Sequence, residues 1–170
     1  MNLPRQLQDM NVHGDGNSFL GECVKFTRPK LTEKLEEYNA GGLLSSGQIS
    51  TGRIEALECT HAYGGGMPTL NRGFGAVELD ANQLRFSGAY QNDATGQLDD
   101  LQIVIRGKHV EIDSGDDEIG SKSGTTYKTN CVYYKQTRNG VVEFEIDIVN
   151  GVFLVYGVDR RAQIRAIIGS

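Results

Sequence analysis

The segment Gly115–Ser123 reads Gly-Asp-Asp-Glu-Ile-Gly-Ser-Lys-Ser and approaches the spacing of a phosphate-binding loop. Such a loop cradles phosphate oxygens with backbone N–H groups and reaches the outer phosphates with its lysine. Lys122 is displaced from that pattern by one position, and three acids stand where phosphate oxygens would have to enter. The segment therefore indicates a solvated acidic loop, not a nucleotide site.

Two other groups of side chains have the types that bind metal ions. Asp113–Glu118 contains four acids, but it lacks the sixth-position glycine and twelfth-position glutamate of an EF-hand loop. Cys59, His61 and Cys131 would supply three zinc ligands, yet zinc sites normally bring their ligands in local pairs, and none pairs here. We therefore expect neither a metal ion nor another cofactor.

The chain also lacks a recognisable set of hydrolytic residues. Gly120–Gly124 has a lysine where a nucleophile elbow has its serine. None of His13, His61 and His109 is near a matched serine or cysteine in the sequence. We expect a protein that is not an enzyme, and a hydrolase remains an alternative only because triad residues need not be neighbours in sequence.

Composition and charge narrow the class of protein further. The 170 residues fit one domain, and 22 glycines against 3 prolines with no tryptophan favour an all-β fold with many tight turns. The formal net charge of -5 argues against binding nucleic acid through its phosphates, which needs a concentrated basic patch. No apolar run approaches the ~20 residues of a membrane span, and Met1–Arg5 begins no signal peptide. We expect folding in a cytoplasm, with Cys23, Cys59 and Cys131 reduced.

The strongest local pattern lies in Val142–Tyr156. Apolar residues alternate there with Glu143, Glu145 and Asp147, the period of a half-buried strand with one acidic face toward water. Asn150-Gly151 follows, and this dipeptide between two apolar runs predicts a hairpin with a type I′ turn. The return strand is apolar at nearly every position, so we expect it to be buried between layers or between subunits.

Alternating patterns predict further strands, separated by turn-forming residues. They cover Leu7–His13, Ser18–Thr27, Arg53–Tyr63, Gln83–Gln91, Leu101–Asp113 and Thr126–Gln136. Asn139-Gly140 joins the last of them to the strand at Val142, which gives a three-stranded meander. Short helices are expected at Met67–Phe74, with Pro68 at the first position, and between Asp159 and Gly169.

The segment Pro29–Gly42 gives an ambiguous pattern. Leu31, Leu35 and Tyr38 recur at helical spacing, with good helix formers between them and Gly41 as a stop. Periodicity alone therefore predicts a helix here.

Three motifs carry a resemblance to a known family. They are Pro-Lys-Leu-Thr-Glu-Lys-Leu-Glu-Glu-Tyr-Asn-Ala-Gly-Gly at Pro29–Gly42, Glu-Ile-Asp-Ile-Val-Asn-Gly-Val at Glu145–Val152, and Gly-Val-Asp-Arg-Arg at Gly157–Arg161. In this order and at this chain length, the sequence resembles the major tail tube proteins of contractile-tailed bacteriophages, the FII-type family shared with R-type bacteriocin tubes, or tailocins.

The resemblance implies a mainly β tail tube fold, a β-sandwich or barrel with one or two short helices, as a single domain over residues 1–170. It implies that six copies form a ring and that rings stack into a hollow conduit for the genome through the host envelope. It also implies that Leu31–Tyr38 is a strand, against its helical periodicity.

The implied partners are further copies of this chain and the tail sheath, baseplate or tube initiator, tape-measure and terminator proteins. Phage DNA would pass through the tube without specific binding. The implied location is the virion tail, assembled in the cytoplasm of the host bacterium.

Two surfaces are expected to serve such a tube. The first is an inter-ring contact, because glycines let a loop lie close to a neighbouring backbone while leucines offer apolar area. It comprises Tyr38, Asn39, Ala40, Gly41, Gly42, Leu43, Leu44 and Gln48. The second is an acidic lumen wall or wet face at Glu143, Glu145 and Asp147, since a negative wall does not hold DNA phosphates.

Two alternatives remain open from the sequence. The first is the tube protein of a related secretion-type contractile injection system, which would carry effector proteins in place of DNA. The second is a monomeric β-barrel that binds a small ligand in an enclosed apolar cavity.

Overall fold

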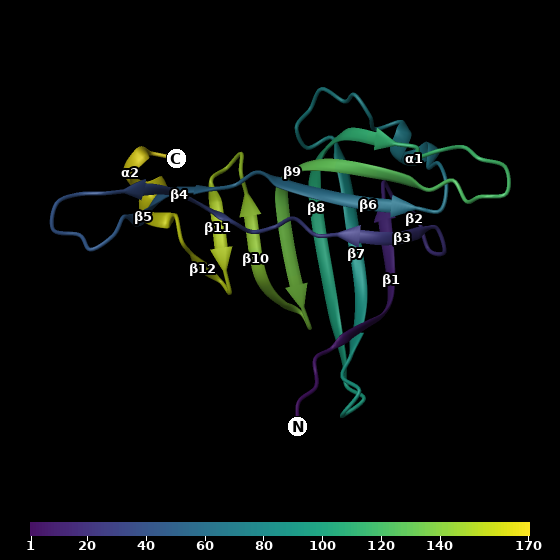
Figure 1. Cartoon of the computed structure of the whole chain (residues 1–170), viewed down its shortest axis with the longest axis horizontal. Coiled ribbons are helices and arrows are strands. Elements are labelled where there is room, and N and C mark those ends of the chain that lie inside the picture. The colour runs from purple at the N-terminus through teal and green to yellow at the C-terminus, as the bar shows by residue number, and fades with distance from the viewer.

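The computed structural model describes all 170 residues, and its elements are almost entirely strands (Figure 1). The strands are β1 (Gln6–Gly14), β2 (Asn17–Ser18), β3 (Cys23–Thr27), β4 (Glu33–Tyr38), β5 (Gly47–Ile54), β6 (Leu57–Tyr63), β7 (Asn82–Gln91), β8 (Leu98–Asp113), β9 (Thr125–Arg138), β10 (Val141–Asp147), β11 (Val152–Val155) and β12 (Val158–Asp159). The helices are α1 (Pro68–Asn71) and α2 (Ala162–Ile168). The predicted mainly β fold with one or two short helices is confirmed. Neither helix has the length and apolar content needed to cross a membrane.

Ten strands form one antiparallel sheet in the order β12-β11-β10-β9-β8-β7-β1-β2, with β6 and β3 attached to β9 off this path. The long strand β9 belongs to two layers. Its N-terminal part pairs with β6, from Thr125 opposite Tyr63 to Cys131 opposite Leu57. Its C-terminal part pairs with β10, from Tyr133 opposite Asp147 to Arg138 opposite Val141. In Figure 1 the β3–β6 pair runs across the strands of the larger layer.

The two layers separate where β8 bends along β9. The register between these strands shifts after Arg106 and again after His109. Gly107 lies at the first shift, and a Cβ added there would come within 2.0 Å of the Asn130 carbonyl oxygen. Glycine is therefore required at this position by the close approach of the neighbouring backbone.

The core fills the space between the layers. Its sixteen buried apolar residues are Val12, Phe19, Leu57, Cys59, Tyr63, Met67, Leu70, Leu84, Phe86, Leu101, Ile103, Ile105, Tyr127, Cys131, Tyr134 and Ile146. The strands reach this core with alternate residues, as the period of two predicts: β6 buries Leu57, Cys59, His61 and Tyr63. All three cysteines are free thiols, and burial raises the pKa of Cys131 to about 12.

The predicted strand Ser18–Thr27 is wrong as a single element. Phe19 inserts into the core, a turn follows it, and Gly21 takes a φ of 83° that a strand does not allow. Only Asn17 and Ser18 pair with β1, while Cys23–Thr27 crosses to the other layer and pairs with β6. Burial of one aromatic side chain therefore outweighs the local strand pattern.

The segment Glu33–Tyr38 is the strand β4, as the family resemblance implied, and not the helix that periodicity predicted. It pairs with β5 from Glu33 opposite Ile54 to Tyr38 opposite Gly47. The backbone hydrogen bonds that a helix would make locally are made here to a strand that lies farther along the chain.

The two Asn-Gly turns differ. Asn139 and Gly140 have φ values of 50° and 80° and directly join the opposed residues Arg138 and Val141, which confirms a two-residue hairpin. At Asn150-Gly151 only the glycine has positive φ, and the loop is longer because Asp147 opposes Val152. The predicted type I′ turn is wrong there, since the Asp147 carboxylate accepts the Asn150 N–H at 3.1 Å and stabilises a wider turn.

Candidate assembly surfaces

The strands β4 and β5 form a separate two-stranded sheet that projects from one end of the molecule (Figure 1). Every residue of β4 is exposed, and in β5 only Thr51 and Ile54 are half-buried. A lone two-stranded hairpin is marginally stable in water. This hairpin arm, Glu33–Ile54, is therefore suited to a contact outside its own chain.

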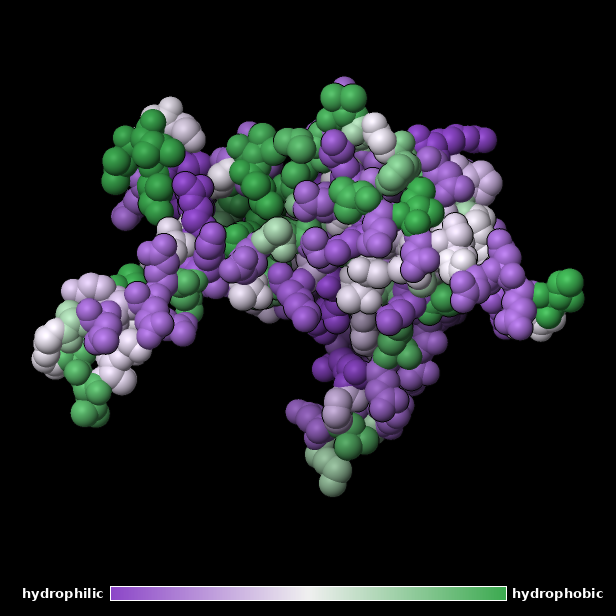
Figure 2. Space-filling view, turned by 45° about the horizontal axis from the view of Figure 1, so that its top comes forward, coloured by the Kyte–Doolittle hydropathy of each residue, from purple (hydrophilic) through white to green (hydrophobic).

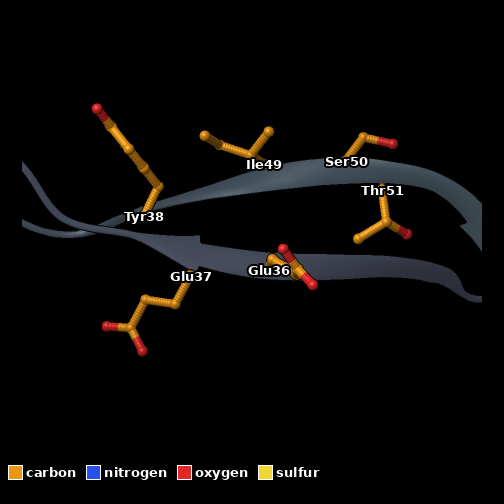
Figure 3. Close-up of a pocket in the computed structure, with 6 residues that line it drawn as sticks. All are labelled: Glu36, Glu37, Tyr38, Ile49, Ser50 and Thr51. Carbon is orange, nitrogen blue, oxygen red and sulfur yellow. The ribbon is translucent and has the colours of Figure 1, made fainter.

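The arm has an apolar side near its end. Tyr38 and Ile49 rise from the same side of the two strands in Figure 3, next to a shallow hollow. The hollow is lined by Glu36, Glu37, Tyr38, Ile49, Ser50 and Thr51. It is open to solvent and contains no enclosed apolar cavity, so it does not have the shape of a small-molecule site.

The residues predicted for the inter-ring contact lie together at the end of this arm. Tyr38 ends β4, residues 39–46 form the connecting loop, and Gly47 and Gln48 begin β5. Leu44 is fully exposed at 106% and Leu43 is exposed as well. Figure 2 shows apolar atoms at the far end of the arm. A solitary loop gains nothing by exposing two adjacent leucines.

The predicted acidic face of β10 is interrupted at Glu143. A bulge between Val142 and Phe144 turns the Glu143 side chain inward, where it is only 8% exposed. The expectation that all three acids share one wet face is therefore wrong for Glu143. Glu145 and Asp147 lie opposite Lys135 and Tyr133 of β9, on the other side of β10 from the buried Ile146.

Glu143 is held by a network of hydrogen bonds. Its Oε1 accepts from Arg138 Nε at 2.8 Å and Gln136 Nε2 at 3.3 Å, and its Oε2 accepts from the Tyr156 hydroxyl at 2.5 Å. Burial would raise the pKa of Glu143, but these hydrogen bonds outweigh burial and hold the pKa below its ordinary value. Tyr156 has a positive φ of 49°, so the network also fixes the turn between β11 and β12.

The larger layer has a second face that no other layer covers. We call it the uncovered face; register and alternation place on it Asp9, Asn11, His13, Arg85, Ser87, Asp100, Gln102, Arg106, Tyr133, Lys135, Glu145 and Asp147. The Arg106 guanidinium lies 4.1 Å from the centre of the Tyr133 ring, and the Tyr133 hydroxyl donates to Glu145 at 2.9 Å. The face is polar and carries both signs of charge.

The cations of this face, Arg85, Arg106 and Lys135, were not among the residues predicted from the sequence to form a surface. Arg85 lies between Leu84 and Phe86, and Arg106 follows Ile105, so each alternates with core residues. That alternation is visible in the sequence. The three cations come from three strands, however, and only the pairing of β7, β8 and β9 brings them onto one surface.

The large sheet ends in two strands with free edges. Along β1, only His13 and Gly14 pair with β2, and the Val12 carbonyl accepts the Phe19 N–H at 2.8 Å, so Gln6–Asn11 has no strand partner on that side. At the opposite end β12 pairs only with β11, through two residues. Unpaired strand edges of this kind readily pair with another chain.

The helix α2 is largely exposed, and only Arg165 is half-buried. It contains no buried residue, although Ile164, Ile167 and Ile168 form an apolar stripe. Arg165 holds it through an ion pair with Asp159 and a 3.1 Å hydrogen bond to the Gly151 carbonyl. Gly169 ends the helix with a φ of 75°, as predicted.

Comparison with known proteins identifies the family of this chain. Residues 4–169 match the family model described as phage tail tube protein FII. The chain belongs to the phage tail tube protein FII family. It is a structural tail tube chain of contractile phage tails and is not an enzyme.

Two relatives agree with this family. The tail tube protein of Escherichia phage P2 is 36% identical over 171 residues, which cover 99% of each chain. The major tail tube protein of Serratia phage KSP20 is 29% identical over 154 residues, which cover 90% of this tail tube chain and 88% of the relative.

A solved structure shares the fold. The sheath/tube terminator of the PVC extracellular contractile injection system, in its extended state, matches with a TM-score of 0.57 and 11% identity. The match covers 79% of this tail tube chain and 97% of the matched chain of that structure. At this identity the likeness concerns the fold alone.

Proposed function

We propose that six copies of this chain close into a ring and that such rings stack into a hollow tube. The observation that carries the proposal is the pair of free edges at opposite ends of one ten-stranded sheet. If the β1 edge of one copy pairs with the β11–β12 edge of the next, the contact is head-to-tail and closes by rotation. Closure pairs both of these edges, which a single copy of this fold cannot do.

The uncovered face is the surface that we assign to the lumen. The opposite face of the sheet packs against β3 and β6, so it is not available as a wall. The charged residues of this face are four acids and three cations, namely Asp9, Asp100, Glu145 and Asp147 and Arg85, Arg106 and Lys135. Their formal charges sum to -1 per copy and to -6 per six-membered ring. A weakly negative wall lets DNA pass without releasing the counterions that drive phosphate binding.

The arm formed by β4 and β5 is the element that we assign to ring stacking. It projects beyond the body of the protomer, and it exposes the apolar side chains of Leu43 and Leu44 to 49% and 106%. Six arms per ring would act together, so tube growth would be steeply cooperative.

The tube would be the conduit through which the genome leaves a phage tail assembled in the bacterial cytoplasm. Its partners would be the tail sheath around it, the baseplate or tube initiator, the tape-measure protein inside it and the terminator at its end. DNA would pass without a sequence-specific site.

The test is the mass and shape of the purified protein. Analytical ultracentrifugation and negative-stain microscopy should show rings of six times 18.6 kDa, or 111.6 kDa, and longer tubes of the same diameter. A protein that stays an 18.6 kDa monomer at high concentration, and that does not polymerise on baseplate seeds, would contradict the proposal.

A further inference from the structure

The apolar stripe of α2 has no covering surface in its own chain. Ile167 and Ile168 are 84% and 66% exposed, on a helix of seven residues. A helix this short is not stable through its own hydrogen bonds and normally depends on packing of its apolar side. The stripe therefore lacks the contact that usually stabilises such a helix.

The loop between β8 and β9, Ser114–Gly124, exposes an apolar side chain and acidic groups that could contact the isoleucine stripe and the arginines of α2. Ile119 projects from it with an exposed fraction of 104%, and Figure 2 shows an isolated apolar group at the end of a projecting segment. The carboxylates of Asp116 and Glu118 have no hydrogen-bond or ion-pair partner in the chain, while Asp117 accepts from the Ser123 hydroxyl at 3.0 Å.

The two elements lie on opposite flanks of the molecule. Figure 1, drawn with the longest axis horizontal, shows α2 at one end and the β8–β9 loop at the other. A ring made by head-to-tail contacts needs two different surfaces on opposite flanks, because each copy presents one to each neighbour. The free edges of the sheet lie on the same two flanks as these elements.

The charges of the two elements are opposite. The loop has three acids and Lys122, a net -2, whereas Asp159–Ile168 has three arginines and one aspartate, a net +2. The exposed guanidinium of Arg160 has no partner within the chain, and Arg161 donates from Nη1 to the Gly52 carbonyl at 2.6 Å. Opposite charges on two surfaces favour contact between those surfaces and fix the register in which they meet.

We propose that the isoleucine stripe of α2 is the docking site for the β8–β9 loop of the adjacent copy in the ring. Ile119 of one copy packs against Ile167 and Ile168 of the next. Glu118 and Asp116 lie beside Arg160 of that copy. This inference rests on the proposed ring and adds to edge pairing a second contact that fixes which flanks meet.

A charge-exchange experiment on the full chain tests the contact. Glu118→Arg and Arg160→Glu should each raise the protein concentration needed for rings about tenfold. The double variant should return it to within about threefold of the unmodified chain, because the pair is restored with reversed sign. Lys30→Glu, an equal charge change at an exposed cation of the β3–β4 connection, is the matched control and should leave ring formation unchanged.

A covalent test uses Ile119→Cys together with Ile167→Cys. Mild oxidation of assembled protein should give a ladder of linked chains that ends at six, whereas each single variant should give none. Rings that form normally in both single charge variants, or a double variant no better than its parents, would overturn the docking while leaving the proposed ring intact. Absence of rings from the unmodified chain would overturn both.

Discussion

His61 and His109, on the two strands that flank β9, share one hydrogen-bond partner, the hydroxyl of Thr129. The hydroxyl lies 2.9 Å from His61 Nε2 and 2.8 Å from His109 Nδ1, and the ring centroids are 5.7 Å apart. Since a hydroxyl has one proton, Thr129 donates to one ring and accepts from the other. The Tyr63 hydroxyl lies 2.9 Å from His61 Nδ1 and completes this series of hydrogen bonds. Two neutral imidazole rings can make all of these hydrogen bonds.

We expect this pair to make the protein sensitive to acid. Burial lowers the pKa of His61 to about 3, helped by the neighbouring His109, whose own pKa burial also lowers. An unfolded histidine has a pKa of about 6.5. Below that pH the unfolded state binds more protons, so the free energy of unfolding should fall as the pH drops from about 6.5 toward about 3. Urea unfolding, followed by circular dichroism at a series of pH values, measures this change in the free energy of unfolding.

The control for the acid prediction is His61→Gln, which removes the titrating group. Its free energy of unfolding should be lower near neutral pH but should vary less between about pH 6.5 and about pH 5, where few carboxylates titrate. An equal slope in both proteins would show that the histidine pair is not the source of the acid sensitivity.

Gly107→Ala should destabilise the fold. Its Cβ would lie 2.0 Å from the Asn130 carbonyl oxygen, so β8 and β9 would have to separate at the bend that joins the two layers. We expect a loss of about 1–3 kcal/mol in the free energy of unfolding. Gly65→Ala is the control, because nothing lies within 4 Å of its Cβ position. Equal unfolding midpoints for the two variants would contradict the prediction.

Glu143→Gln should weaken the corner at β11 and β12. The substitution removes the charge that pairs with Arg138 and accepts from Tyr156, in a position that is nearly closed to water. We expect a loss of about 1–3 kcal/mol in the free energy of unfolding. Glu111→Gln changes an exposed glutamate without a side-chain partner and should alter stability by less than about 0.5 kcal/mol. Equal losses in both variants would show that the network does not stabilise the fold.

Leu43→Asp combined with Leu44→Asp should stop tube growth without unfolding the chain. Burying two leucines across a contact is worth roughly 3 to 6 kcal/mol before ordering costs, and the arm exposes both. Single rings should still form, and electron microscopy should show no long tubes. Ser45→Asp with Ser46→Asp adds the same charge in the same loop without removing apolar area. Tubes of normal length from the leucine variant would place the stacking contact elsewhere.

Local patterns predicted most of the strands but not where their ends lie in space. Asn139-Gly140 formed the expected turn because both residues take positive φ without help from the rest of the chain. Asn150-Gly151 has the same two residue types, yet the side chain of Asp147 changes its turn. A dipeptide thus determines a turn only where no neighbouring side chain competes for its backbone groups.

Residue order and local geometry were enough to predict the mainly β class, the alternation of core and surface residues, and the family. They could not show that Glu143 turns inward from the acidic run of β10, that β8 and β9 bend at Gly107, or that the cations of three strands share one face. Each of these three features depends on pairing between different strands. A bulge or a register shift moves a side chain to the other face without changing any residue near it.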